Sequence, residues 1–455
     1  MNKTILRRKS STPGVPFGDR THSAPTSPER QRLSVVVIIF LVSILIPVSF
    51  WIGPLRITPY RLLLLALFIP LLIIWLRRGF GRISTPDVLI VSCACWAVLA
   101  LVVNHGVEIT LEASGIILIE TITPYFIARR YVRNKSQFLS LINGLVILVI
   151  ILTPFAIFET VTSRPIILEI LGQAFNVFPD MPTRPRFGMY RSQVVFEHPI
   201  LFGAFCSSIL GAAFYINKRP VRPIVRAFRI SSLLVASVCS VSTGAVAALV
   251  IQIGLITWDR LTRGLHRRWM ILAILFVAAY IVVALLSNRT PFHVFVTYLT
   301  FSVETAYGRI QIFEWGMNNV RQHPIFGIGL NDWERPAWAS SSFDNFWLLV
   351  AMRYGIPAFA FLAGAYFVLI YRIGNSWIED KEVSTYRTGF LITLAGIGIA
   401  GCTVAFWNAI YCYLLFILGS AHWMMSGAKE EQSSFQFPVK NPKASDKHGL
   451  FPDLK

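Results

Sequence analysis

Charged residues are scarce in this sequence, and acidic residues are the scarcest of them. Only 14% of the 455 residues are charged and 55% are hydrophobic, with 23 Asp and Glu against 42 Lys and Arg. The few charges are bunched between long apolar blocks. This pattern excludes an ordinary soluble domain and is typical of a protein that crosses a membrane many times.

Several chemical motifs are also missing. No G-K-[ST] motif occurs, so the glycines of "HPIFGIG" at 323–329 predict a tight turn and not a cradle for ATP phosphates. The six cysteines all fall in apolar spans, which leaves no disulfide framework and no loop cluster with metal-ligand spacing. A D-x-D motif is absent, and "DWE" at 332–334 is only a weak relative of one. The sequence therefore predicts no cofactor and no metal site.

The apolar blocks are long enough to cross the hydrocarbon core of a bilayer as helices. A further apolar tract at 229–258 is broken at "SVSTGA" and reads as two helices. We therefore predict an all-α polytopic membrane protein with about twelve transmembrane helices. The single blocks lie at 34–52, 60–76, 87–103, 111–128, 138–158, 198–216, 270–287, 356–373, 388–406 and 408–425.

Lys and Arg are concentrated in alternate connections and in both tails, which the positive-inside rule assigns to the cytoplasm. The same bias, with attraction to anionic lipid head groups, accounts for the net charge of +19 without a nucleic-acid partner. We predict a disordered basic cytoplasmic tail at 1–33, a membrane domain at 34–425 and a polar cytoplasmic tail at 426–455. Two long loops, at about 160–197 and 288–354, then face the other side.

The first long loop carries three arginines in "PTRPRFGMYRSQ". Arginine on the outer face runs against the positive-inside bias, so Arg186 and Arg191 either reach lipid phosphate or bind an anionic ligand. Arg184 lies between two prolines and is expected to be a solvated turn residue. Glu197 and His198, at the mouth of the next span, either cap that helix or take part in a site.

The second long loop contains a helical pattern. Ile310, Phe313, Met317 and Val320 are spaced three, four and three residues apart, which predicts a helix with one apolar face on the membrane or the bundle. Arg309 is expected to open this helix. The second loop is therefore predicted to be partly helical.

Two carboxylates remain to be explained. Asp344, followed by Asn345, stands where a polar stretch gives way to an apolar run, so it either caps the next helix or accepts a proton from a nucleophile. Glu120 falls near the middle of a span, where a carboxylate is costly. A functional role and a structural hydrogen bond to a neighbouring helix both remain open for Glu120.

The combination of "RSQVVFEHPILFG", "SVSTGA", "GRIQIFEWGMNNVRQHPIFGIG" and "DNFWLLVAMRYGIPA" resembles the O-antigen ligase and Wzy-type polysaccharide polymerase superfamily, over about residues 85–425. This resemblance implies a GT-C type integral membrane glycosyltransferase with about a dozen spans and a large periplasmic loop. It further implies metal-independent, inverting transfer of glycan from undecaprenyl diphosphate.

The resemblance also implies roles for individual residues. The family's donor-binding arginines match Arg191 and Arg309, and Arg186 is an additional candidate. Ligases of the family carry a His-Asn pair where this chain has Asp344 and Asn345, a departure that favours a polymerase of exopolysaccharide or O-antigen repeat units. The predicted catalytic residues are Asp344, Arg191 and Arg309, and the predicted substrate-binding residues are Arg186, Glu197, His198 and Asn345.

Two alternatives remain beside the polymerase. One is an O-antigen ligase that differs in its acceptor, and the other is a polysaccharide transporter or flippase, which Glu120 and the break at "SVSTGA" would also suit. The expected partners are the undecaprenyl-diphosphate-linked glycan, a glycan acceptor and the lipid bilayer, with a chain-length regulator as a further candidate. The expected location is the bacterial inner membrane, with both termini in the cytoplasm.

Overall fold

The structure is a computed structural model. It describes residues 33–53, 55–181, 185–216, 222–287, 294, 303–339 and 341–425. The predicted tails lie outside the described residues, apart from residue 33, and so does Arg184.

Long apolar helices dominate the described residues, and nine of them are long and apolar enough to cross a membrane. The predicted helical membrane protein is confirmed in this coarser form. The nine are α2 (Pro59–Leu76), α3 (Thr85–Tyr131), α4 (Lys135–Thr162), α6 with α7 (Pro199–Ser208, Leu210–Ile216), α9 (Thr243–Leu261), α10 (Arg268–Leu286), α13 (Phe346–Asn375), α14 (Lys381–Gly401) and α15 with η1 (Asn408–Ser420, His422–Met425).

The predicted count of twelve stays a prediction, because four of the predicted spans do not appear as separate long helices. Two of them, 87–103 and 111–128, lie within α3 on either side of Gly106. The short helix α8 (Pro223–Cys239) has 17 residues. The first predicted span is only partly helical, since α1 (Val35–Ser43) ends early and is followed by a hairpin of β1 (Phe50–Ile52) and β2 (Leu55–Ile57).

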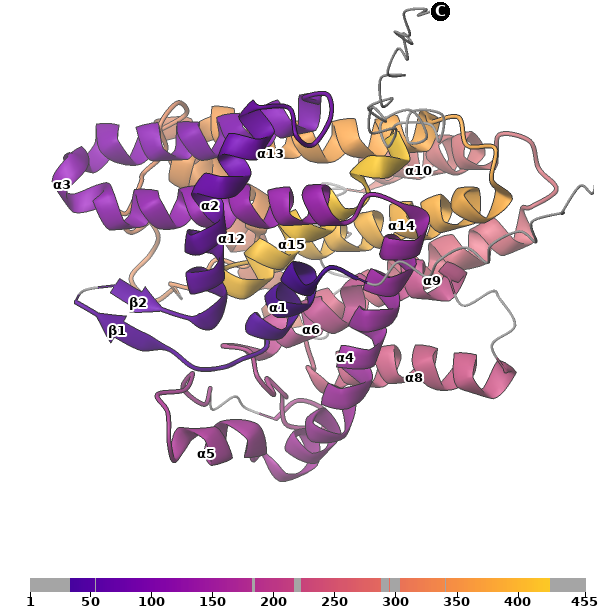
Figure 1. Cartoon of the computed structure of the whole chain (residues 1–455), viewed down its shortest axis with the longest axis horizontal. Helices are drawn as coiled ribbons and strands as arrows, with labels where there is room; N and C mark the ends of the chain where they lie inside the picture. Colours follow the sequence, from indigo (N-terminus) through magenta and orange to yellow (C-terminus); the bar gives the residue numbers. More distant parts are fainter. Residues whose placement is uncertain are drawn as a thin grey trace, which may run out of the picture. The chain divides into compact units, whose positions relative to one another are not determined.

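Two helices bend sharply at glycine. Gly106 in α3 has φ 77° and ψ 165°, and Figure 1 draws the two halves of α3 doubling back on each other. Gly355 in α13 has φ 85° and ψ 167°. Glycine reaches such positive φ values without the steric penalty of a Cβ atom. The bend at Gly355 also explains why α13 begins at Phe346, earlier than the predicted end of the second loop at 354.

The predicted "HPIFGIG" turn is present and docks between these two bends. Gly327 and Gly329 have φ of 62° and 61°. Asn104 Nδ2 in α3 donates to the carbonyl oxygen of Phe326 (3.0 Å), and the amide of Ile356 in α13 donates to that of Pro324 (2.8 Å). The turn therefore ties α3 to α13, and a Cβ at Gly355 would lie 1.9 Å from a carbonyl oxygen of the turn.

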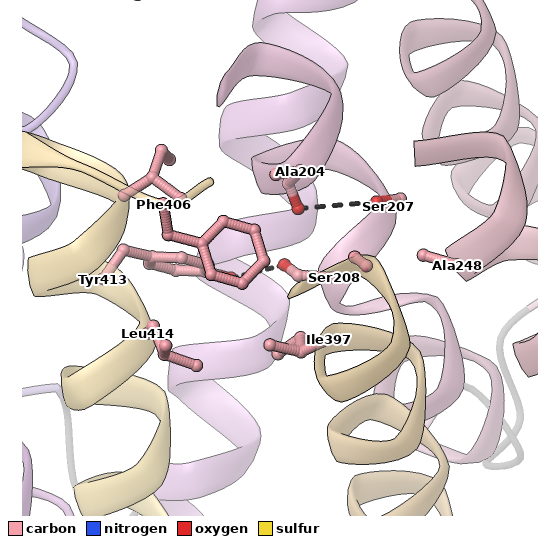
Figure 2. Close-up of a pocket in the computed structure, with 10 residues that line it drawn as sticks. Ala204, Ser207, Ser208, Ala248, Ile397, Phe406, Tyr413 and Leu414 are labelled. Atoms are coloured by element: carbon pink, nitrogen blue, oxygen red, sulfur yellow. Dashed lines mark hydrogen bonds between the residues drawn. The ribbon is translucent and has the colours of Figure 1, made fainter. Parts of the chain in front are cut away.

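The tract at 229–258 is two helices, as predicted. The helix α8 ends at Cys239 and α9 begins at Thr243, so the break falls within "SVSTGA". Around this break the core is packed from α6, α9, α14 and α15, with small residues that allow close approach, as Figure 2 shows around Ala204 and Ala248. The break therefore leaves non-helical backbone between Cys239 and Thr243, surrounded by packed helices.

The helical pattern of the second loop forms α12 (Val303–Gln322). Three of the four residues predicted on its apolar face pack as expected. Val320 is buried, and Phe313 and Met317 pack in the same cluster, which includes Phe343 and Leu348. The expectation that Arg309 opens the helix is wrong, since α12 begins at Val303 and Arg309 lies in its second turn.

Candidate functional site

The end of the first loop, residues 190–194, is held by the end of α4 and the break between α8 and α9. The amides of Gln193 and Val194 donate to the two carboxylate oxygens of Glu159 (2.7 and 3.0 Å), and the amide of Ser192 donates to the carbonyl oxygen of Cys239 (3.0 Å). Arg191 Nε makes a long hydrogen bond to the carbonyl oxygen of Ser240 (3.5 Å). The break at "SVSTGA" therefore helps to fix Arg191.

The backbone is strained on both sides of this contact. Val194 has φ 56° and Val241 has φ 43°. Positive φ is a true outlier for a β-branched residue, and such strain persists only where the surroundings impose it. Strain of this kind is concentrated at functional sites, which draws attention to the segment that carries Arg191.

Arg186 lies in a tight hairpin in the same loop. Arg186 and Met189 exchange backbone hydrogen bonds of 2.9 and 3.0 Å across Phe187 and Gly188, which both have positive φ. Two successive positive φ values belong to the turn that closes a two-residue hairpin. This turn holds the half-buried Arg186 close enough to Arg191 and Arg309 for its charge to act on both.

Arg309 is the most deeply buried of the loop arginines. Its exposed fraction is 9%, and its Nε and Nη1 atoms are buried without a hydrogen-bond partner among the described residues. Burial lowers the pKa of Arg309, Asp344 opposes this shift and Arg186 adds to it. An unpaired buried guanidinium costs several kcal/mol, so its surroundings resemble a binding site awaiting an anion.

Arg191 belongs to the same electrostatic group. Burial lowers the pKa of Arg191 to about 10, the charges of Arg186 and Arg309 push it in the same direction, and Asp344 opposes them. Arg191 therefore stays charged at neutral pH. The structure thus brings three of the predicted residues together with Asp344, and we call Arg186, Arg191 and Arg309 the arginine cluster.

Asp344 does not cap the helix that follows it. The N-cap of α13 is Asn345, whose side-chain oxygen accepts from the amide of Leu348 at 3.0 Å. The predicted capping role of Asp344 is therefore wrong by one residue. Asp344 is half-buried, and its Oδ1 accepts a hydrogen bond from Ser342 Oγ at 3.2 Å. The charge of its carboxylate acts on Arg191 and Arg309, and among the described residues it forms no ion pair with either.

His198 is the N-cap of α6. Its Nδ1 accepts from the amide of Ile200 at 3.1 Å, so Nε2 carries the proton of the neutral ring. Burial lowers the pKa of His198 to about 4, and the charge of Arg191 adds to that shift. Its ring packs edge-on against Trp407 with 5.9 Å between centroids. His198 therefore lies beside the cluster as a neutral hydrogen-bond donor.

The contacts of Glu197 are with Arg56 and Asn408 and not with the arginine cluster. It pairs with Arg56 (Nη2 to Oε1, 3.4 Å) and accepts a hydrogen bond from Asn408 Nδ2 at 2.5 Å. Arg61 Nη2 donates to Asn408 Oδ1 (3.1 Å), and Arg61 Nε donates to Glu120 Oε1 (2.7 Å). Glu120 thus has the structural partner that the sequence left open, and a polar chain links Arg56 to Glu120 across the bundle.

This polar chain lines a cavity of about 340 Å³, which we call the outer cavity. Its polar residues are few, and aromatic rings form much of its wall, a composition common in ligand sites. An apolar groove of about 410 Å³ between α2 and α3 shares Arg61 and Ile116 with it. The outer cavity is lined by, among others, Arg61, Glu120, Arg353, Phe346, Trp407, Asn408 and Tyr411.

A second void lies in the packed core near the outer cavity and is too small to be a site. It measures about 10 Å³, which is room for about one water molecule. Figure 2 shows residues that line it, among them Ser208 and Tyr413, whose hydroxyls lie 2.9 Å apart. Phe406 lines both spaces, so this ring separates the core from the outer cavity.

No sequence motif marks Arg61, Arg353, Trp407 or Asn408, which lie at or near the ends of apolar blocks. Asn408 has φ 50°, an unusual conformation that only the folded chain reveals. Among the described residues, no group of three or more His, Cys, Asp or Glu side chains gathers as a metal site would require.

Residues 229–363 match the family model of the O-antigen ligase. This segment, and not the whole chain, is similar to an O-antigen ligase domain. The match confirms the predicted membership of the O-antigen ligase and Wzy-type superfamily, and it supports a glycan-transfer function of the ligase or polymerase type. The matched segment includes the break between α8 and α9, Arg309 in α12 and Asp344. No curated protein matches the chain.

Proposed function

We propose that this protein transfers a glycan from a polyprenyl diphosphate to a hydroxyl group of a second glycan. The observation that carries the proposal is the buried Arg309, with two nitrogen atoms unpartnered among the described residues. Two further arginines add their charge to the same space. A diphosphate would supply both the negative charge and the acceptor oxygens that this arrangement lacks.

The arginine cluster would act mainly on the leaving group. As the acceptor oxygen bonds to the anomeric carbon, the bond from that carbon to the diphosphate oxygen breaks and negative charge grows on the diphosphate. Fixed guanidinium groups in a partly buried site stabilise such charge without reorganising. Attack from the side opposite the diphosphate would invert the anomeric centre, and this chemistry calls for no metal ion.

The proton of the acceptor hydroxyl would pass to Asp344. The half-buried carboxylate lies within the field of Arg191 and Arg309 and is free of the capping hydrogen bond that Asn345 makes. His198 is the other titratable group beside Arg191, but its Nδ1 already accepts a backbone hydrogen bond and its Nε2 carries a proton. His198 therefore suits a donor to phosphate, and Asp344 suits the base.

The outer cavity suits a sugar residue of either substrate. Trp407 joins it to the cluster, because one indole ring lines the cavity and packs against His198. Arg61, Arg353 and Asn408 offer polar contacts to hydroxyl groups, and the aromatic walls offer apolar surface. The apolar groove that shares Arg61 is suited to part of the polyprenyl chain.

The acceptor decides between two versions of this function. We favour a polymerase of lipid-linked repeat units, because Asp344 and Asn345 stand where ligases of the superfamily carry a His-Asn pair. The ligase is the second candidate, because the matching family model is that of the O-antigen ligase. In both versions the reaction would take place at the periplasmic face of the inner membrane.

Transfer itself is tested with the purified protein in lipid nanodiscs and a polyprenyl-diphosphate-linked oligosaccharide donor. Arg191→Ala and Arg309→Ala should each abolish product formation while the protein still elutes as a folded species. Lysine at either position should rescue poorly, because an ammonium group cannot bind the diphosphate through two parallel hydrogen bonds. Full activity in both alanine variants would overturn the proposal.

The acceptor is tested in the same system. With the lipid-linked repeat unit as the only substrate, a polymerase makes a ladder of longer lipid-linked chains. A ligase makes no ladder and forms product only when a second, glycosylated acceptor lipid is added. A product that requires the acceptor lipid would replace the polymerase assignment with the ligase.

A further inference from the structure

An apolar pocket lies at the end of the bundle away from the arginine cluster. It measures about 310 Å³ and opens between α7, α8 and α9. Phe214 is near the end of α7, and Arg260 is near the end of α9, whereas the break that holds Arg191 is at the other ends of α8 and α9. The pocket therefore belongs to a separate surface. Its apolar lining includes Leu210, Phe214, Ile230, Leu234, Ile253 and Ile256.

Two arginines share one aromatic ring at the rim of this pocket. Arg226 Cζ lies 4.9 Å from the centroid of the Phe214 ring, and Arg260 Cζ lies 4.8 Å from it. Arg263 is close enough for its charge to act on Arg260 as well. Three positive charges so close together repel one another unless an anion lies between them.

The charge of the neighbouring Asp259 acts on Arg260, but the direct contacts of this acid are with other residues. Asp259 pairs with Arg268 (Nη2 to Oδ1, 2.8 Å) and accepts a hydrogen bond from the Tyr215 hydroxyl at 2.5 Å. Arg226 and Arg260 make no ion pair or hydrogen bond with any described residue, although both stack on Phe214. Their hydrogen-bond donors therefore remain available at the mouth of an apolar space.

We propose that this pocket binds an anionic phospholipid, with its phosphate on Arg226 and Arg260 and one acyl chain among the apolar side chains. Guanidinium groups bind phosphate oxygens through paired hydrogen bonds, and basic pockets between membrane helices hold anionic head groups. A free phosphate ion would leave the apolar space unfilled, and a neutral lipid would leave the arginines unpaired. The charge and the cavity together match a ligand that is anionic at one end and apolar at the other.

The test uses delipidated full-length protein in a neutral detergent, with thermal unfolding and native mass spectrometry as readouts. Phosphatidylglycerol should raise the melting temperature and remain bound in the mass spectrum, because a ligand that binds only the folded state stabilises it. Phosphatidylcholine with the same acyl chains and inorganic phosphate should do neither. An equal response to both lipids, or a full response to phosphate alone, overturns the proposal.

Substitutions at the pocket test whether phosphatidylglycerol binds there. Arg226→Gln and Arg260→Gln should each weaken phosphatidylglycerol binding roughly tenfold, as expected for loss of a hydrogen bond to a charged group. Arg77→Gln, at an exposed arginine just after α2, is the matched control and should leave binding unchanged.

Ile230→Phe keeps both arginines and fills the pocket, so it should also reduce lipid binding. If the glutamine variants fail to fold, Ile230→Phe still tests whether the lipid binds in the pocket. Unchanged binding in Ile230→Phe, or an equal loss in Arg77→Gln, would mean that surface charge alone attracts the lipid and would overturn the site.

Discussion

An arginine side chain is buried in two regions of the described structure, and the two regions differ in whether a protein carboxylate pairs with it. Where the two ends of α3 meet, Arg129 of its last turn pairs with Asp87 of its first turn. Arg129 Nη2 also donates to the carbonyl oxygen of Arg82 at 2.7 Å. Asp87 also accepts hydrogen bonds from the Tyr125 hydroxyl (2.8 Å) and from the amide of Ser84 (2.7 Å). In the arginine cluster, Arg309 is similarly buried, but both its Nε and its Nη1 lack a hydrogen-bond partner among the described residues, whereas in Arg129 only Nε does. The charge of Arg186 also acts on Arg309, and that of Arg309 acts on Arg191.

The difference teaches how to tell a structural charge from a binding charge. A buried ion pair that is broken leaves one charge without a partner and destabilises the fold. A buried charge that never had a protein partner already carries that penalty in the free protein. We therefore expect the Asp87 and Arg129 pair to stabilise the fold, and Arg309 to bind a ligand. Substitutions at the two places should separate activity from stability.

The largest expected effect is on activity, at Arg309. Arg309→Met should lower kcat/KM for glycan transfer by about 10²- to 10³-fold, the usual effect of losing one group that stabilises charge in the transition state. Its melting temperature in detergent should be unchanged or higher, because an unpaired buried charge is removed. A strongly destabilised Arg309→Met protein would mean that Arg309 stabilises the fold, as Arg129 does. The distinction between the two arginines would then be wrong.

The converse is expected at Arg129. Arg129→Met should destabilise the protein by about 3–5 kcal/mol, because Asp87 is left buried and unpaired. The double variant Asp87→Leu/Arg129→Met should recover much of this loss, and its remaining folded fraction should transfer glycan normally. Thermal unfolding of the single and double variants measures the effect. No recovery in the double variant would contradict the pairwise explanation.

Asp344 and Asn345 offer the same contrast between adjacent residues. Asp344→Asn should lower kcat by roughly 10²-fold or more, the range for loss of a general base, with little change in melting temperature. Asn345→Ala should cost about 1 kcal/mol of stability, because the N-cap hydrogen bond to Leu348 is lost. Normal turnover in Asp344→Asn would remove Asp344 from the mechanism, and the Asn345 variant is its matched control.

The smallest expected effect is a pH dependence at His198. The folded-state pKa of His198 is about 4, below its ordinary value, so between that ordinary value and pH 4 the unfolded chain binds a proton that the folded protein does not. This part of the stability is complete above pH 6.5 and is lost as the pH falls toward 4. Melting temperatures across that range should show the decline.

His198→Asn is the matched variant for this effect, because asparagine can cap α6 without titrating. Its melting temperature should depend less on pH over the same range. An identical pH profile in the two proteins would assign the decline to another group.

Much of the fold could be predicted from the sequence because apolar runs of membrane-spanning length are local signals. The break at "SVSTGA", the turn at 323–329 and the apolar face of α12 were all readable from spacing and turn residues. The end of α1 was not, because residues 44–52, which lead into the first strand of the hairpin, are nearly as apolar as those of a span. The bend at Gly355 was also missed, because it depends on contact with a turn some thirty residues earlier.

By itself, the sequence determined that arginines and an acid stand in the two long segments between apolar spans and that the chain resembles glycan-transferring membrane proteins. Only the tertiary structure determined which of these residues lie close together. It brings Arg186 and Arg191 from one loop beside Arg309 and Asp344 from another, and it assigns the cap of α13 to Asn345. The physical reason is that helix formation depends on neighbouring residues, whereas hydrogen-bond partners and burial depend on segments far apart in the chain. The unpartnered state of Arg309 is such a property.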